Sequence, residues 1–271
     1  MGKNIVDAPF MRELIATCSN MYRLGWNERN GGNISVLLDD AEIAEYAHAL
    51  KPLRQIDVRF DASELSGKTF AVTGTGKYFK NVETDPSLNL GILRICPDGK
   101  TADILWGFSD GGRPTSELPA HLRSHIARLQ RDPRQRVVMH CHATNTLAMT
   151  FLHPLDEREF TRTLWKMCTE CIVVFPEGVG VLPWMLCGND EIGKETAKKM
   201  QSCRICIWAQ HGIFGAGTSL DETFGLIETV EKAAEIFIKI GGQKIVTTIQ
   251  DRELKVLAEA FGVDYRKDYL E

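Results

Sequence analysis

Hydrophobic and polar positions along this chain follow two periods. Residues 7–24 carry apolar side chains at helical spacing and predict an amphipathic helix that Asp7 begins. The same period, with polar residues at the start of each segment, predicts helices over residues 144–152, 156–167, 189–201, 221–240 and 251–261. Short runs of apolar and β-branched residues predict strands near residues 34–38, 70–73, 90–95, 102–106, 136–140, 171–175 and 205–208.

The predicted strands and helices are intermingled, which is typical of an α/β or α+β protein. Neither a repeat nor a linker-like change of composition divides the chain, so residues 1–271 are interpreted as a single domain. Residues 39–68 are charged and weakly periodic, and we expect them to form a surface excursion with a short helix near residues 41–49.

Composition excludes some classes of function. The 271 residues have a net charge of −4 and carry no basic stripe, which argues against a nucleic-acid partner. Neither a membrane-spanning run nor a signal peptide is visible, so we expect a cytoplasmic protein without a membrane partner. The pairs Cys168/Cys171 and Cys203/Cys206 run into strand-like segments without the usual glycine, so we interpret the eight cysteines as reduced thiols.

The strongest chemical signal is a pair of histidines at the end of a predicted strand. His140 and His142 are two residues apart, so a strand presents both on one face and Cys141 on the other. His211 follows another apolar run and precedes a glycine. Three histidines without a fourth protein ligand are typical of a catalytic zinc site that keeps one position open.

Three segments can offer backbone N–H groups to an anion. Residues 30–33 and 73–77 are glycine turns beside predicted strands, and a helix predicted from Thr115 or Ser116 to residue 130 offers its N-terminus. Glu117 lies in the first turn of that helix. Glu117, His121 and His125 would share one helical face, which leaves an alternative metal cluster open.

A metal site combined with anion-binding loops indicates a small phosphorylated substrate. A Lewis-acidic zinc ion polarises a carbonyl group, and a nearby carboxylate moves protons. This chemistry fits aldol cleavage, isomerisation or epimerisation beside a ketone. A zinc hydrolase remains an alternative, because a three-histidine site also activates water.

Six segments of the chain resemble the class II aldolase/adducin family in its own order. They read W-N-E-R-N-G-G-N-I-S, V-T-G-T-G-K-Y-F, W-G-F-S-D-G-G-R-P-T-S-E-L-P-A-H, M-H-C-H-A-T-N, T-E-C-I-V-V-F-P-E-G-V-G and L-D-E-T-F-G-L-I-E, and lie between residues 7 and 240. The resemblance implies a three-layer α/β/α fold around a central, mainly antiparallel sheet flanked by helices. It also implies a homotetramer with active sites at the subunit interfaces.

The resemblance carries roles onto individual residues. It implies His140, His142 and His211 as ligands of one Zn²⁺ per subunit, and Glu117 as the catalytic carboxylate. It implies Glu170 as a second acidic group that acts in the neighbouring subunit's site. It implies a phosphate-binding set from three loops, namely Asn30, Gly32, Asn33, Thr75, Gly76, Thr115 and Ser116.

Two departures accompany this resemblance. Thr75 stands where the family pattern favours Ser, a change that keeps the hydroxyl group, and residues 39–68 and the C-terminal tail match poorly. The implied activity is zinc-dependent cleavage of a phosphorylated ketose. Another zinc sugar-phosphate aldolase or epimerase of the family remains an alternative, as does a non-catalytic adducin-like interaction module, although the latter lacks the metal ligands present here.

Overall fold

The computed structural model of this chain describes residues 3–270; residues 1, 2 and 271 of the predicted domain lie outside them. Its centre is a nine-stranded sheet in the order β2-β5-β4-β3-β1-β6-β9-β8-β7. All neighbouring strands are antiparallel except β7 and β8, which are parallel. The strands are β1 (Asn33–Leu38), β2 (Arg54–Asp57), β3 (Thr69–Thr73), β4 (Leu90–Ile95), β5 (Thr101–Gly107), β6 (Val137–Cys141), β7 (Gly180–Leu182), β8 (Ile205–Trp208) and β9 (Gly212–Gly217).

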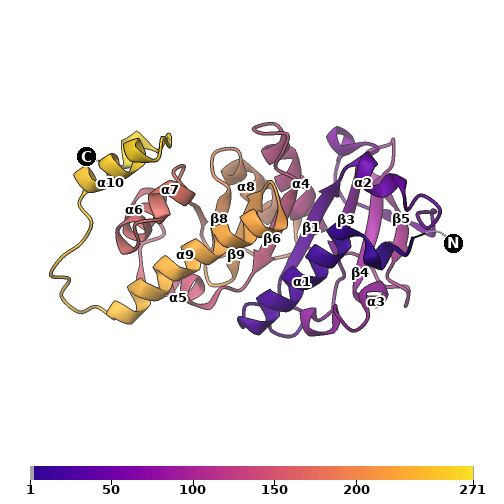
Figure 1. The fold of residues 1–271 in the computed structure, drawn as a ribbon, viewed down its shortest axis with the longest axis horizontal. Coiled ribbons are helices and arrows are strands. Elements are labelled where there is room, and N and C mark those ends of the chain that lie inside the picture. Colours follow the sequence, from indigo (N-terminus) through magenta and orange to yellow (C-terminus); the bar gives the residue numbers. More distant parts are fainter. Residues whose placement is uncertain (1–2, 271) are drawn as a thin grey trace.

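Helices cover both faces of the sheet and make three layers (Figure 1). Helices α1 and α9 lie on one face, and α4 and α8 lie on the other. The predicted α/β fold with a mainly antiparallel central sheet is therefore confirmed. The longer helices are α1 (Pro9–Arg23), α4 (Leu118–Leu129), α5 (Thr144–Leu152), α6 (Glu157–Met167), α8 (Asp190–Met200), α9 (Leu220–Ile240) and α10 (Asp251–Ala260); the short ones are α2 (Asp40–Ala44), α3 (Pro86–Asn89) and α7 (Cys171–Val174), with 3₁₀ turns at Ile5–Asp7, Ser63–Leu65, Phe79–Asn81 and Lys267–Tyr269.

Strand β6 lies in the middle of the sheet and sets which side chains meet. Val137, Met139 and Cys141 belong to the core beneath α1 and α9, whereas Val138 belongs to the core beneath α4 and α8. The register pairs His140 with Asn33 of β1 on one side and with Phe214 of β9 on the other. Residues from three distant segments therefore meet at one end of the sheet.

Several predicted elements differ from the structure. Residues 171–174 form one turn of helix, α7, rather than a strand, because Phe175 N donates to Cys171 O and closes a turn that buries Cys171 and Ile172 in the core. Strand β2 within residues 39–68 was not expected, since R-Q-I-D has a single apolar residue, yet it pairs with β5 as the edge strand. Strand β7 was not predicted, and it pairs in parallel with β8.

The helix starts also differ by a few residues. Ala8 rather than Asp7 precedes α1, and the Ser219 side chain rather than Asp221 caps α9. Glu117, not Thr115 or Ser116, is the residue before α4, although the Thr115 hydroxyl accepts a hydrogen bond from Glu117 N. The short helix expected near residues 41–49 is found as α2 and ends already at Ala44, whereas the helices predicted over residues 144–152, 156–167, 189–201 and 251–261 are found within two residues of their expected ends.

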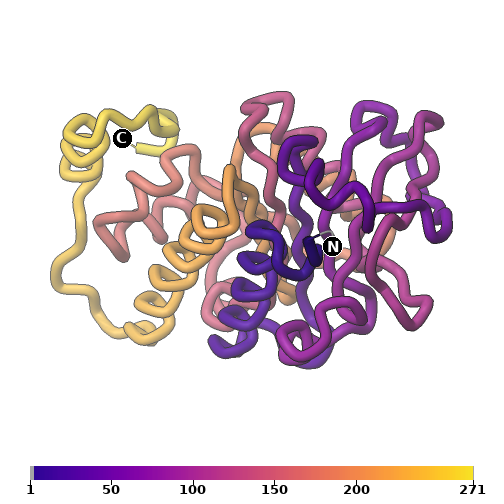
Figure 2. Tube along the Cα trace, turned by 45° about the vertical axis from the view of Figure 1, so that its right-hand side comes forward, coloured from indigo at the N-terminus to yellow at the C-terminus, as the bar shows by residue number. Residues whose placement is uncertain are grey.

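The C-terminal part of the chain turns back on itself. Gly241, with a φ of 59°, ends α9, and an exposed stretch at residues 242–249 leads to α10 (Figures 1 and 2). Helix α10 buries Leu254 and Ala258. The residues after it are not merely a charged tail, since Tyr269 and Leu270 are buried in the core.

Within residues 3–270, the longest helices are too short or too polar to cross a membrane.

One buried carboxylate fixes the turn that follows β6. Glu231 of α9 is 7% exposed and accepts hydrogen bonds from Asn145 N at 2.9 Å and from Thr146 N at 2.8 Å. It also accepts bonds from both of those side chains. Because backbone N–H groups at the start of a helix have no intrahelical acceptor, Glu231 completes the N-terminus of α5 directly after His142.

We predict that Glu231→Ala lowers the free energy of unfolding by roughly 2–4 kcal/mol, because four donors lose a charged acceptor. Denaturant unfolding of the metal-free protein measures it. Glu228→Ala, at an exposed position of the same helix, is the matched control and should change stability by less than about 0.5 kcal/mol. Equal losses in the two variants would contradict the assigned role.

Candidate active site

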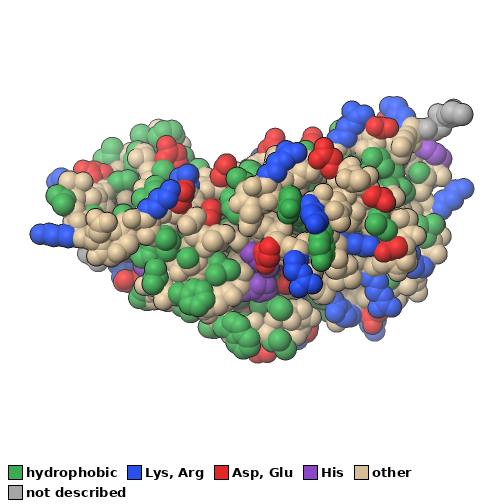
Figure 3. All heavy atoms as spheres, turned by 90° about the horizontal axis from the view of Figure 1, so that it is seen from below, with side chains coloured by type: hydrophobic (Ala, Val, Ile, Leu, Met, Phe, Trp, Pro, Cys, Tyr) green, Lys and Arg blue, Asp and Glu red, His purple; other side chains and the backbone are tan. Residues whose placement is uncertain are grey.

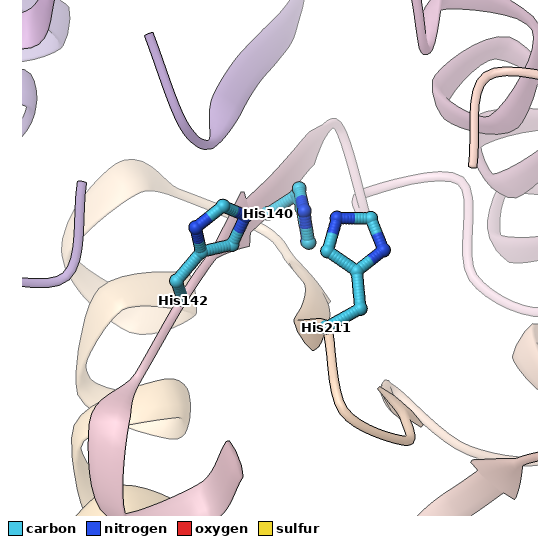
Figure 4. Close-up of side chains that lie close together, drawn as sticks. All are labelled: His140, His142 and His211. Atoms are coloured by element: carbon cyan, nitrogen blue, oxygen red, sulfur yellow. The ribbon is translucent and has the colours of Figure 1, made fainter. Parts of the chain in front are cut away.

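Three imidazole rings converge at the end of β6 (Figure 4). His140 lies in the strand, His142 follows it, and His211 comes from the turn between β8 and β9. Their ring centroids are 5.4 Å apart for His140–His142, 5.0 Å for His140–His211 and 5.3 Å for His142–His211. One nitrogen of each ring lies within 4.8 Å of the others. The predicted trio therefore forms a cluster.

Hydrogen bonds fix which nitrogen of two rings faces the cluster. His140 Nδ1 donates to the carbonyl oxygen of Ile213 at 3.0 Å, and His142 Nδ1 donates to Glu28 Oε1 at 2.8 Å. Each Nε2 is then the unprotonated nitrogen, with its lone pair available. His140 Nε2 is buried and has no hydrogen-bond partner. A buried polar atom without a partner is costly unless a ligand satisfies it.

Burial lowers the pKa of two of the three rings. Burial, together with the neighbouring His211 and His142, lowers the pKa of His140 well below its usual value. Burial and His142 also lower the pKa of His211 to about 4. Neutral imidazoles are the form that binds a metal ion, because protonation would occupy the ligand nitrogen.

The donor set fits a divalent metal ion of the kind that favours nitrogen ligands. Cys141 is buried beneath α1 and α9 on the opposite face of β6, as expected from the strand period. The alternative cluster of Glu117, His121 and His125 does not form. His121 and His125 instead lie on either side of Ser35 Oγ, at 2.7 Å and 2.8 Å.

Glu117 lies beside the three histidines. Its Oε2 is 3.7 Å from His140 Nε2, and its Oε1 is 3.9 Å from His211 Nε2. Asn33 Nδ2 donates to Oε2 at 2.8 Å. Burial raises the pKa of Glu117, and the bond from Asn33 opposes that rise. A raised pKa brings a carboxyl group closer to the range in which it can both accept and donate a proton.

The glycine loops and the start of α4 line the same pocket as the histidines. The pocket measures about 190 Å³. All of the predicted phosphate-binding residues lie on its wall, namely Asn30, Gly32, Asn33, Thr75, Gly76, Thr115 and Ser116. Thr75 N donates to Arg113 O and Thr115 N donates to Thr73 O, both at 2.9 Å, so two of the three loops are held together.

Two adjacent glycines couple the first loop to the metal cluster. A methyl group on Gly31 would lie 2.8 Å from the His142 ring, and one on Gly32 would lie 1.8 Å from Asn27 Nδ2. Gly32 also has a φ of 71°, which L side chains rarely adopt. The loop at residues 30–33 can approach His142 this closely only because Gly31 lacks a side chain, and it can pack against Asn27 and the His140 carbonyl group only because Gly32 does.

The segment at residues 39–68 supports the loop before α4. Arg54 of β2 donates to Gly112 O, and Arg59 Nη2 donates to Ser116 O at 2.6 Å. These two bonds hold both ends of the segment that carries Thr115. The excursion therefore contacts the pocket wall, a role that its sequence did not reveal.

Glu170 is the one predicted site residue that lies elsewhere. It precedes α7 and is exposed, and it is absent from the residues that line the pocket. The Cys168 thiol donates to its Oε2 at 2.7 Å, and this bond lowers the pKa of Glu170. Within one subunit, the structure does not bring Glu170 to the histidines.

Two residues at the site were not found by sequence reasoning. Glu28 fixes His142, and Cys187 lies on the pocket wall with its sulfur within 4.8 Å of Glu117 and His211 donor atoms. Glu28 lies in the segment W-N-E-R-N-G-G-N-I-S, which could have indicated it, whereas Cys187 lies outside the quoted motifs and reaches the site through the fold. Figure 3 shows histidine side chains at the surface in the middle of the face that the site opens on, with acidic and basic groups beside them.

Comparisons with known proteins agree with this geometry. Residues 12–238 match the family model described as "Class II Aldolase and Adducin N-terminal domain". The chain is 59% identical to a rhamnulose-1-phosphate aldolase of Listeria monocytogenes, covering 100% of this chain and 99% of that protein. It is 56% identical to one of Enterococcus faecalis, covering 99% and 96%.

A solved structure shares the same arrangement. The sugar-phosphate aldolase of Thermotoga maritima superposes with a TM-score of 0.74 at 28% identity, covering 87% of this chain and 97% of that one. The family model and the relatives extend over most or all of the sequence that forms the sheet and the pocket. This chain belongs to the class II aldolase and adducin family.

Proposed function

We propose that this chain is a zinc-dependent aldolase that reversibly cleaves L-rhamnulose 1-phosphate to dihydroxyacetone phosphate and L-lactaldehyde. The observation that carries the proposal is a single pocket that joins three clustered histidines, a buried carboxylate and three anion-competent loops. The sugar is taken from the near-full-length relatives that bear the name rhamnulose-1-phosphate aldolase. This activity would serve rhamnose catabolism.

In this proposal His140, His142 and His211 hold one Zn²⁺ per subunit. The ion would supply a Lewis acid for the substrate carbonyl and leave a coordination position open. Glu28 and the carbonyl group of Ile213 orient two of the ligands through their Nδ1–H groups. Such outer partners raise the basicity of a histidine ligand and hold its ring in place.

Glu117 is proposed to move the proton of the carbon that becomes nucleophilic. It is buried, it lies within 4 Å of two of the histidines, and its pKa is raised by burial. A carboxylate at this place can accept a proton and return it in the reverse direction. Asn33 holds one of its oxygens, so the other is free to face the substrate.

The substrate phosphate is assigned to the part of the pocket wall that the three loops form. The Thr75, Thr115 and Ser116 hydroxyl groups lie there, together with the backbone of residues 30, 32 and 76. Converging N–H groups and a helix N-terminus stabilise a phosphate group. Holding the phosphate fixes the distance from the carbonyl group to the histidines, which orients the reacting carbon.

We further propose a cytoplasmic homotetramer in which each site receives Glu170 from a neighbouring subunit. The position of Glu170 supports this, because it is exposed and separated from the pocket of its own subunit. In the partner's site its carboxylate would act near the aldehyde end of the substrate.

Removal of the metal ion should abolish cleavage. Chelator-treated protein is expected to release no dihydroxyacetone phosphate from L-rhamnulose 1-phosphate, and stoichiometric zinc should restore the release. His142→Ala should lose stoichiometric zinc, whereas His48→Ala, at an exposed histidine outside the site, should keep it. Metal analysis and a coupled product assay measure these outcomes. Undiminished cleavage after complete zinc removal would refute the proposal.

Glu117→Gln should lower turnover by roughly 10²–10⁴, the usual contribution of a general acid–base group. Zinc content should remain near one per subunit, because the three histidines are intact. Steady-state kinetics and metal analysis of the same sample test both expectations. Near-wild-type turnover would exclude the assigned proton transfer. Fuculose and ribulose phosphates, assayed in parallel on the wild type, separate the rhamnulose assignment from its family alternatives.

Hybrid tetramers test whether Glu170 acts in a neighbouring subunit. Glu117→Gln and Glu170→Gln subunits should each be nearly inactive alone. After co-refolding or co-expression, some interfaces would combine an intact Glu117 with an intact Glu170 from the other subunit. Activity should then rise well above that of either parent. If Glu170 acted within its own subunit, every site would lack one carboxylate and the mixture would stay inactive.

A further inference from the structure

Three buried polar residues behind the pocket have no role in the proposed chemistry. Ser35 of β1 and His121 and His125 of α4 are all 0% exposed, and they are absent from the pocket wall. Ser35 Oγ lies 2.7 Å from His121 Nδ1 and 2.8 Å from His125 Nε2. Burying two imidazoles and a hydroxyl group is costly unless their hydrogen bonds are made, so their arrangement requires an explanation.

These residues connect to the pocket through Asn33. His121 Nε2 hydrogen-bonds to Asn33 Oδ1, and Asn33 Nδ2 donates to Glu117 Oε2 at 2.8 Å. Asn33 is thus the junction between the buried residues and two functions of the pocket. It holds the carboxylate proposed to move the proton, and it lies on the wall assigned to the substrate phosphate.

The direction of each hydrogen bond in this series follows from the Glu117 carboxylate at its end. An ionised carboxylate only accepts hydrogen bonds, so Asn33 turns its NH₂ group toward Glu117 and its oxygen toward His121. His121 Nε2 must then carry the proton, and His121 Nδ1 accepts from the Ser35 hydroxyl group. Ser35 Oγ accepts in turn from His125 Nε2–H. The remaining nitrogen, His125 Nδ1, is buried without a partner, as this direction requires of an unprotonated end.

The uncharged state of both rings agrees with this direction. Burial lowers the pKa of His121 and of His125 to about 3, with His125 contributing to the shift of His121 and the bond to Ser35 opposing that of His125. A neutral imidazole donates from one nitrogen and accepts at the other, so the direction of one of its hydrogen bonds fixes the direction of the next.

We propose that Ser35, His121 and His125 are positioning residues that fix the amide of Asn33, so that it offers N–H groups both to Glu117 and to the substrate phosphate. This inference rests on the proposed function. An amide turned over by 180° would place its oxygen against the carboxylate and against the phosphate, which is repulsive at both places. Without the Ser35 hydroxyl, His121 can adopt the other tautomer and accept from Asn33, which favours the inverted amide.

The test compares Ser35→Ala with Ser124→Ala. Ser124 is equally buried on α4, between the two histidines, but its Oγ makes no hydrogen bond, so its removal controls for loss of a buried hydroxyl group. For Ser35→Ala we expect kcat to fall by roughly tenfold or more, the scale of other outer positioning contacts. KM for L-rhamnulose 1-phosphate should rise severalfold, and zinc content should not change. Ser35→Thr, which keeps the hydroxyl group, should recover most of both losses.

A second measurement does not depend on turnover. Calorimetric titration of the zinc-loaded protein with inorganic phosphate should show weaker binding for Ser35→Ala and unchanged binding for Ser124→Ala. In an Asn33→Ala background, Ser35→Ala should have little further effect on phosphate affinity, since both changes act through one amide.

The outcomes separate the two proposals. If the wild type binds phosphate but does not cleave the sugar phosphate, the proposed reaction fails. The phosphate titrations still test whether Ser35, His121 and His125 position the Asn33 amide. The proposed positioning role is overturned if Ser35→Ala only lowers the folded fraction, with KM and phosphate affinity unchanged. It is also overturned if the effects of Ser35→Ala and Asn33→Ala are fully additive.

Discussion

The site depends on a buried nitrogen that the protein leaves without a partner. His140 Nε2 is enclosed, its ring is stacked on Phe214 at a centroid distance of 4.6 Å, and its other nitrogen is held by Ile213 O. An unsatisfied buried polar atom costs about 1–3 kcal/mol. The pairing of β6 with β9 keeps the ring in this position, and a metal ion would recover the cost. The sheet therefore stabilises an arrangement of the ring that is unfavourable without a ligand and favourable with one.

The two sets of groups that line the pocket favour ligands of opposite charge. Burial lowers the pKa of His140 and of His211, which favours a cation that their lone pairs can hold. The three loops offer hydroxyl groups and backbone polar groups, which favour an anion. Glu117 stands between them, and its protonation responds to both. A substrate with a phosphate at one end and a carbonyl group beside it matches this division of the pocket.

The metal cluster could be predicted from the sequence because its signal is local: H-x-H in a strand fixes the relative direction of two rings. The residues predicted to bind phosphate came from glycine turns and from the family resemblance, and the structure brings them to one pocket. Other features could not be predicted, since they depend on tertiary contacts. Strand β2 has one apolar residue and is recruited by β5, and α7 is a β-branched run that never reaches the sheet. Glu28 and Cys187 reach the site only through loop paths.

The glycines at positions 31 and 32 have a consequence for how this site can evolve. Their absent side chains let the loop at residues 30–33 lie against the His142 ring, Asn27 and the His140 carbonyl group, so a side chain at either glycine would displace one of these groups. The loop and the histidine cluster are therefore constrained to change together. A change in ligand preference is expected from other parts of the pocket wall, where substitutions do not displace His142.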